Sequence, residues 1–201
     1  MSDLISLAKA LEFLLSDARA NPEFLVDVRK HNPMHTVPVL VDGERAISDS
    51  TAICHYLDRK LPDPPLWPAG LAGAGAFEFA ALADSAIQVL VDLGMRCHAL
   101  HDHPEFPTVR ATLVGRAQRA LDALAHKVSA HEPSSGPLLD GGWGWADIVC
   151  YTTVAWLEGL PKRAPNFAPA QHVVDLGWSL PISLSRWADQ HRERADVRAL
   201  G

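Results

Sequence analysis

The spacing of apolar residues changes along the first part of the chain, from a helical period to patterns typical of short strands. Leucines near helical spacing over residues 4–15 predict an amphipathic helix. Residues 22–28 (PEFLVDV) are rich in side chains that suit a pleated, half-buried surface, and they predict a short strand. Residues 36–41 (TVPVLV) predict a second strand, which contains a proline.

A hairpin and a helix are predicted next. Asp42-Gly43 is a tight-turn signal between two apolar runs, so residues 45–47 should form the returning strand. Ser48-Asp49-Ser50 then supplies helix-start chemistry for a helix over residues 51–61.

A proline-rich run separates this part from a purely helical one. Residues 62–68 (PDPPLWP) cannot carry a helix or a central strand, so we interpret residues 62–71 as a linker. The pattern beyond it predicts helices over residues 72–100, 109–130, 146–157 and 181–200, with breaks at the glycines of 136–144 and at Pro161, Pro165 and Pro169. Mixed elements followed by helices predict an α+β chain with segregated domains, residues 1–61 and 72–201.

Composition and charge limit the partners and the cellular compartment that we expect for this chain. The net charge of −6, with acidic and basic residues interspersed, argues against nucleic acid or an acidic membrane surface as a partner, because either needs a basic patch. Three cysteines without a CxxC fit a reducing compartment. No apolar run approaches the length of a membrane span, and Asp3 stands where a signal peptide carries positive charge. We therefore expect a cytoplasmic protein with no membrane span.

The proline within the second strand needs an explanation, because proline cannot donate to a sheet ladder. Val37-Pro38 lies between Asn32-Pro33 and the Asp42-Gly43 turn, and Asp49-Ser50 follows. This order resembles the glutathione transferase family, in which a Val-Pro step with a cis bond opens a strand and an acidic residue followed by Ser begins the next helix. The resemblance continues through GGWGWADI (residues 141–148) and the tail LSRWADQHRERADVRAL (residues 184–200).

The resemblance implies a thioredoxin-like N-terminal domain followed by an all-helical bundle. It also implies an enzyme that conjugates glutathione, its cosubstrate, to a small hydrophobic electrophile, and a homodimer. A related glutathione-dependent isomerase or lyase stays open, because a fold does not fix a function. A non-catalytic binding or scaffold protein of the same fold is the competing hypothesis from another class.

Particular residues follow from the resemblance. A cis bond before Pro38 would turn the backbone of Val37 outward to pair with glutathione as an added strand. Asp49 would accept from the ligand's ammonium group, and Ser50 with the helix start would hold its γ-glutamyl carboxylate. His35 and Lys9 could meet the glycine carboxylate, although a solvated surface residue is the better interpretation of Lys9. The simpler interpretations are an ordinary helix cap at Asp49-Ser50 and a trans proline on an edge strand.

The activating group is predicted near the N-terminus. Only about five residues precede Ser6, so the first strand of the domain is expected to be short or absent. Ser6 is the best-placed hydroxyl to stabilise a glutathione thiolate, Ser2 is second, and loss of the group is the third possibility. No cysteine precedes Cys54, which excludes a cysteine mechanism at the usual position.

Other polar residues receive structural interpretations. Cys97, His101 and His103 are residue types that bind zinc, but no second cluster supplies further ligands, and we expect no metal. The resemblance places His98 or His101 beside the electrophile. Cys54 is expected to be buried and inert. Asp147, three residues after Gly144, is expected to cap a helix.

Overall fold

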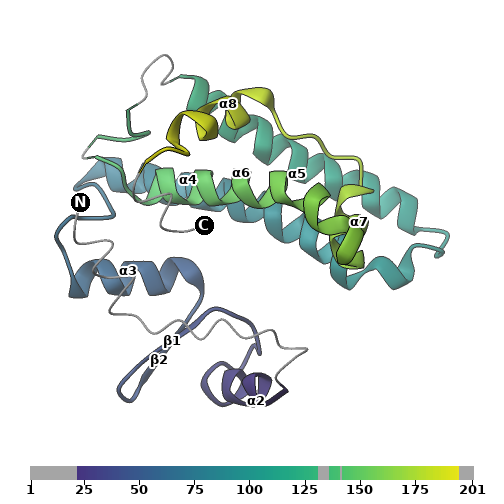
Figure 1. Cartoon of the computed structure of the whole chain (residues 1–201), viewed down its shortest axis with the longest axis horizontal. Coiled ribbons are helices and arrows are strands. Elements are labelled where there is room, and N and C mark those ends of the chain that lie inside the picture. The colour runs from purple at the N-terminus through teal and green to yellow at the C-terminus, as the bar shows by residue number, and fades with distance from the viewer. Residues whose placement is uncertain (1–21, 131–135, 141, 195–201) are drawn as a thin grey trace. The chain divides into compact units, whose positions relative to one another are not determined.

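The computed structural model describes residues 22–130, 136–140 and 142–194, and it divides between Leu66 and Trp67 into two compact units (Figure 1). The first unit contains a helix, a two-stranded hairpin and a second helix. The second unit is helical throughout the residues that are described. The predicted helix over residues 4–15 lies outside the described residues.

The first described element corrects the sequence prediction. Pro22–His31 forms helix α2 rather than a strand. Proline favours the first helical position, Glu23 lies in the first turn, and the basic residues Arg29, Lys30 and His31 lie in the last turn. These end signals outweigh the strand propensity of the apolar residues between them.

The predicted hairpin is confirmed. Strand β1 (Val39–Asp42) pairs antiparallel with β2 (Arg45–Ser48), with Val39 opposite Ser48 and Asp42 opposite Arg45. Gly43 has a φ of +61°, a left-handed value that glycine adopts without steric cost in a two-residue turn.

Helix α3 (Ser50–Lys60) follows β2 almost as predicted. Near the end of α3, the Asp58 carboxylate accepts a hydrogen bond from the backbone N–H of Leu66. This bond ties the proline-rich segment, which contains a cis bond before Pro64, back to α3 within the first unit.

The second unit contains five α-helices in its described part. They are α4 (Leu71–Val91), α5 (Phe106–Ser129), α6 (Trp145–Arg163), α7 (Ala168–Val174) and α8 (Ile182–His191). Several details differ from the sequence prediction. Pro161 lies inside α6 and Pro169 lies inside α7, so neither ends a helix. The helix predicted over residues 72–100 is α-helical only as far as Val91, and in the described residues the helix predicted over residues 181–200 is α-helical only as far as His191.

Helix α4 is the central helix of the second unit and packs against both α5 and α6 (Figure 1). Small buried side chains let these helices approach closely. The buried residues of α4 include Ala76, Phe79, Ala83, Ala86 and Leu90. Contrary to our expectation, one helix over Gly73–Arg96 is long and apolar enough to cross a membrane. The α4 part of this helix packs against α5 and α6.

A π turn follows α4. Asp92–Arg96 forms this turn, and the N–H of Cys97 donates to the carbonyl of Asp92 at 2.8 Å. Gly94 lies against Val173 of α7, and a Cβ added at Gly94 would come within 2.5 Å of that side chain. The absence of a side chain at residue 94 therefore permits the contact between the π turn and α7.

Asp147 holds the start of α6, as expected. The residue is 1% exposed, and its carboxylate accepts from the N–H of Gly144 at 3.0 Å and from the N–H of Leu138 at 2.8 Å. The second contact joins α6 to the preceding loop, a role beyond a helix cap. Burial raises the pKa of Asp147, and the two N–H groups act to lower it.

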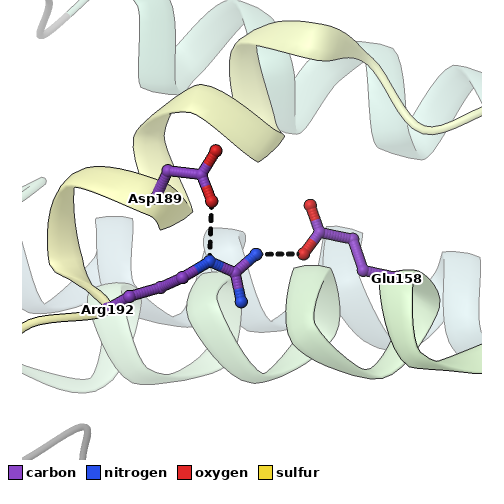
Figure 2. Close-up of polar contacts among 3 residues, drawn as sticks. All are labelled: Glu158, Asp189 and Arg192. Atoms are coloured by element: carbon purple, nitrogen blue, oxygen red, sulfur yellow. Dashed lines mark hydrogen bonds and ion pairs between the residues drawn. The ribbon is translucent and has the colours of Figure 1, made fainter.

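An ion-pair cluster joins the end of α8 to α6 (Figure 2). The guanidinium of Arg192 donates from Nε to Asp189 at 2.6 Å and from a terminal nitrogen to Glu158. Figure 2 shows the guanidinium lying between the two carboxylates. Both carboxylates raise the pKa of Arg192 above its ordinary value.

Candidate functional site

The hairpin register brings the predicted ligand-binding residues to one end of the first unit. The ladder begins where Val39 pairs with Ser48. Val37-Pro38 immediately precedes one member of this pair, and Asp49-Ser50 immediately follows the other. The two predicted dipeptides, which are far apart in sequence, therefore lie at the same end of the β1–β2 hairpin.

Asp49 forms the junction between β2 and α3. Its Oδ1 accepts from the N–H of Ala52 at 3.0 Å, and its carbonyl accepts from the N–H of Ile53 at 2.9 Å. The helix-cap interpretation of Asp49 is thus observed. The residue is exposed, and a carboxylate has capacity for further donors beyond one cap hydrogen bond. Capping α3 and accepting from a ligand are compatible.

The Val37-Pro38 bond is cis, as predicted. Val37 precedes the ladder of β1 and β2, and 61% of its surface is exposed. Its peptide groups accordingly lie beside the first ladder pair rather than within it. This position suits the addition of an extended ligand.

His35 and Asp49 share an unusual backbone conformation. Their φ angles are 55° and 80°, and they are the two non-glycine residues with positive φ among those that the structure describes. Such conformations are uncommon for residues with a Cβ and cluster at ligand sites. Both residues had been selected from sequence for their chemistry, so backbone geometry adds an independent reason to place a site here.

Asn32 is a site feature that the sequence interpretation missed. Its side chain is buried, and its Nδ2 donates to the carbonyl of Thr36 at 2.7 Å and to the Thr36 hydroxyl at 3.1 Å. Its Oδ1 accepts from the N–H of Met34 at 2.9 Å, and its carbonyl accepts from the N–H of His35 at 3.0 Å. In the sequence, an Asn directly before a proline indicates only a turn, although Asn side chains commonly bond to nearby backbone.

The opposite end of the hairpin carries a separate polar cluster. Tyr56 and Lys60 of α3 both donate to the Asp42 carboxylate, and these two hydrogen bonds lower the pKa of Asp42. The same contact raises the pKa of the Tyr56 phenol. An open groove here is lined by Asp42, Glu44, Arg45, Ala46 and Tyr56. This cluster lies at the turn end of the hairpin, away from Val37-Pro38 and Asp49-Ser50.

The predicted activating groups, Ser6 and Ser2, lie outside the described residues. Cys54 is half-buried rather than fully buried. Burial, helped by the charge of Asp49, raises the pKa of its thiol to about 11. Because a thiol with this pKa is protonated at neutral pH, Cys54 is a poor nucleophile, as expected.

The cysteine and histidines near the π turn are spread along an exposed segment. Cys97 is half-buried, and His101 is exposed with Nε2 at 4.0 Å from a carboxylate oxygen of Asp102. Within residues 22–130, 136–140 and 142–194, no group of three or more His, Cys, Asp or Glu side chains is arranged to hold a metal ion.

Sequence comparison finds similarity to known proteins over part of the chain. Residues 7–60 match the family model described as the glutathione S-transferase N-terminal domain. Glutathione S-transferase Z1 of Arabidopsis thaliana is 48% identical over 60 residues, which are 30% of this chain and 27% of that protein. A probable maleylacetoacetate isomerase of Vibrio cholerae is 44% identical over 52 residues, 26% of this chain and 23% of that protein. The matches thus span about a quarter of these relatives' lengths.

Structural comparison extends the likeness to most of the chain. A glutathione S-transferase from Methylobacterium radiotolerans, in complex with glutathione sulfonate, superposes with a TM-score of 0.62 at 19% identity, covering 86% of this chain and 74% of that one. A glutathione transferase family member from Pseudomonas fluorescens Pf-5, with bound S-(propanoic acid)-glutathione, gives a TM-score of 0.58 at 19% identity, covering 88% and 90%. This likeness confirms the predicted fold class, a thioredoxin-like domain followed by an all-helical domain.

Proposed function

Because the chain belongs to the glutathione S-transferase family, we propose that it is a glutathione-dependent enzyme that joins the glutathione thiolate to a small hydrophobic electrophile. The observation that carries the proposal is the placement of Val37-Pro38 and Asp49-Ser50 at one end of the hairpin. The ligands named for the two structural neighbours, glutathione sulfonate and a glutathione conjugate, support glutathione as the cosubstrate.

The exposed groups at this end match the chemistry of glutathione. The ligand's ammonium group donates to the Asp49 carboxylate, beside the cap contact with Ala52. Its γ-glutamyl carboxylate accepts from the Ser50 hydroxyl and from the first N–H groups of α3, because a helix start lacks intrahelical acceptors for them and favours anions. The cysteinyl peptide pairs with the backbone of Val37, and the glycine carboxylate meets His35.

The thiolate is the reacting species. A hydroxyl that donates a hydrogen bond to the sulfur lowers the pKa of the bound thiol, and Ser6 is the residue we propose for this role. The thiolate sulfur forms a bond to the electrophilic carbon. The carbon either expels its leaving group with the bonding electrons or, in an addition, passes the new charge to a neighbouring atom that takes up a proton.

A glutathione-dependent isomerase is the second candidate. The similarity to a probable maleylacetoacetate isomerase favours an isomerase over a lyase. The stoichiometry of glutathione separates isomerisation from conjugation. Conjugation consumes one glutathione for each product, whereas an isomerase returns glutathione at the end of every turnover. Thiol titration during turnover therefore decides between them.

Calorimetric titration with glutathione tests the shared part of the proposal. Asp49→Ala and Ser50→Ala should each weaken binding roughly ten- to hundred-fold, because a hydrogen bond to a charged group contributes about 1.5–3 kcal/mol. Asp122→Ala, at an exposed carboxylate on α5, is the matched control and should bind like wild type. Wild-type protein that shows no binding would refute the enzyme and leave a scaffold protein of this fold.

We also propose that the protein is a homodimer, as the family resemblance implies, and that it is cytoplasmic, as its sparse cysteines without a CxxC suggest. Analytical ultracentrifugation at micromolar concentration should give about twice the chain mass of 21.8 kDa. Sedimentation at the mass of one chain would refute the dimer without affecting the glutathione site.

A further inference from the structure

We propose that Asn32 is a positioning residue of the glutathione site, holding the segment that presents His35 to the glycine carboxylate of the ligand. This inference rests on the proposed function and deepens it. Asn32 touches no reacting atom. It acts through the segment that follows α2, and it is one of the few polar residues of the described chain that are fully buried.

The contacts of Asn32 account for most of the order in this segment. The side-chain amide donates to both oxygen atoms of Thr36, and the side-chain oxygen accepts from the N–H of Met34. The main-chain carbonyl accepts from the N–H of His35, and the main-chain N–H donates to Val28 of α2. One residue thus fastens Met34, His35 and Thr36 to the end of α2.

This anchoring explains how His35 keeps a left-handed backbone. A φ of 55° is unfavourable for a residue with a Cβ and persists where surrounding contacts determine it. Met34, His35 and Thr36 are all exposed, so little apolar packing contributes. The hydrogen bonds to Asn32 are the contacts that hold His35 in this conformation. His35 is followed directly by Thr36 and Val37.

Loss of the Asn32 side chain should therefore act on one end of the ligand. The segment would sample several conformations, and the apparent affinity would fall with the fraction that remains competent. The γ-glutamyl end, held at Asp49 and Ser50 on α3, would keep its contacts. A general loss of stability would not distinguish the two ends of glutathione, whereas a positioning role predicts that it is the glycine end that suffers.

Calorimetric titration with glutathione and with γ-glutamylcysteine, which lacks the glycine carboxylate, tests this inference. In Asn32→Ala the glutathione affinity should fall about tenfold, and the affinity for γ-glutamylcysteine should change far less. Asn32→Asp keeps the acceptor for Met34 but loses the donors to Thr36, so it should show the same selective loss and serves if the alanine variant does not fold. Thr36→Val removes only the hydroxyl acceptor and should bind both ligands nearly as wild type does.

The outcomes separate this inference from the function on which it rests. An equal loss for both ligands, or no loss for either, overturns the positioning role while wild-type binding still upholds the proposed function. Absence of glutathione binding by wild type overturns both. Amide hydrogen exchange gives a ligand-free measurement, because the Met34 N–H donates to the Asn32 side chain and its exchange should accelerate in Asn32→Ala. Unchanged exchange at Met34 would overturn the role of Asn32 directly.

Discussion

The two units of this chain are organised by different physical means. In the first unit, Val28 is the one fully buried apolar residue among residues 22–66 whose side chains are described, and α3 has no fully buried residue. The second unit has a continuous apolar core to which α4, α5, α6, α7 and α8 all contribute. Hydrogen bonds and turn conformations shape the first, and side-chain packing shapes the second.

Each unit nevertheless has one buried polar residue that fastens a loop. Asn32 does so beside the candidate site, and Asp147 does so inside the helical unit, each at 1% exposure. Two similar buried polar residues therefore have different expected roles, which are ligand binding for Asn32 and stability for Asp147. Changes in the second unit should alter stability and leave ligand affinity intact, whereas changes in the first should alter affinity more than stability.

The largest expected effect is at Asp147. Replacement by alanine leaves the N–H groups of Leu138 and Gly144 buried without this acceptor, at about 1–3 kcal/mol each, so Asp147→Ala should lower the free energy of unfolding by roughly 2–6 kcal/mol. Urea unfolding measures this loss. Asp122→Ala, at an exposed carboxylate, should stay within about 0.5 kcal/mol of wild type. Equal effects of the two substitutions would contradict the anchoring role.

The pH dependence of stability separates the effect of the Asp147 charge from the effect of its side-chain shape, which Asp147→Asn keeps. Burial raises its pKa, so the folded state binds the proton more tightly than the unfolded state does. Relative to Asp147→Asn, wild type should gain stability as the pH falls, reach a constant difference below about pH 3.9, and lose this gain as the pH rises through the folded pKa. A stability difference that does not vary with pH would show that the pKa is not raised.

Asp49→Gly tests whether a change in the first unit lowers glutathione affinity without lowering stability. Glycine adopts a φ of 80° at no steric cost and is only a few tenths of a kcal/mol poorer than Asp as an N-cap. The free energy of unfolding should therefore change by less than about 0.5 kcal/mol. Glutathione affinity should fall ten- to hundred-fold, or about 1.4–2.8 kcal/mol, because the carboxylate is lost. Calorimetry measures the affinity of this variant, and urea unfolding measures its stability. Comparable losses of binding and unfolding free energy would contradict the expected difference between the two units.

Gly94→Ala tests how closely the second unit is packed. The added methyl would lie 2.5 Å from Cγ2 and 2.8 Å from the Cα of Val173, so we expect a loss of about 1–3 kcal/mol from the free energy of unfolding. Gly115→Ala, inside α5, meets only the flexible end of Arg119 at 3.4 Å and should instead stabilise by about 0.5–1 kcal/mol. Thermal unfolding of the pair gives the sign, and a tolerated alanine at residue 94 would refute close packing at the π turn.

The smallest expected effect is at Arg192. Its side chain is 42% exposed, and partly exposed ion pairs contribute little because solvent screens them. Arg192→Gln should cost less than about 1 kcal/mol despite its two carboxylate partners, and the cost should shrink at high salt. Unfolding measured at low and high salt checks this. A loss as large as that of Asp147→Ala would show that surface charge rivals the core in this unit.

Sequence patterns anticipated the elements with strong local signals. The Asp42-Gly43 turn predicted the hairpin, and the helix start at Asp49-Ser50 was placed within one residue. Residues 22–28 were assigned wrongly because strand propensity was weighed above end signals. The proline at the first helical position and the basic residues of the last turn carried the correct information.

The candidate site was only partly predictable. The chemistry of Asp49, Ser50 and Val37 is visible in the order of motifs, but whether they bind glutathione stays a prediction. The role of Asn32 was not foreseen, because an amide that bonds to Met34 and Thr36 leaves no periodic pattern. The left-handed backbone at His35 and Asp49 likewise depends on contacts that form only in the folded chain.

The π turn after α4 has a consequence for how the length of this chain can change. A π turn is an α-helix with one extra residue accommodated by a wider hydrogen-bonded ring. Removing Asp92 or Leu93 would restore ordinary helical hydrogen bonding and turn the later positions of this helix, Gly94 among them, by about 100° around the helix axis. Gly94 would then no longer face Val173, and Cys97 would change its direction. A deletion that leaves the helix intact would thus still reorganise its surroundings, so chain length at this turn is fixed by the neighbouring helix rather than by α4 itself.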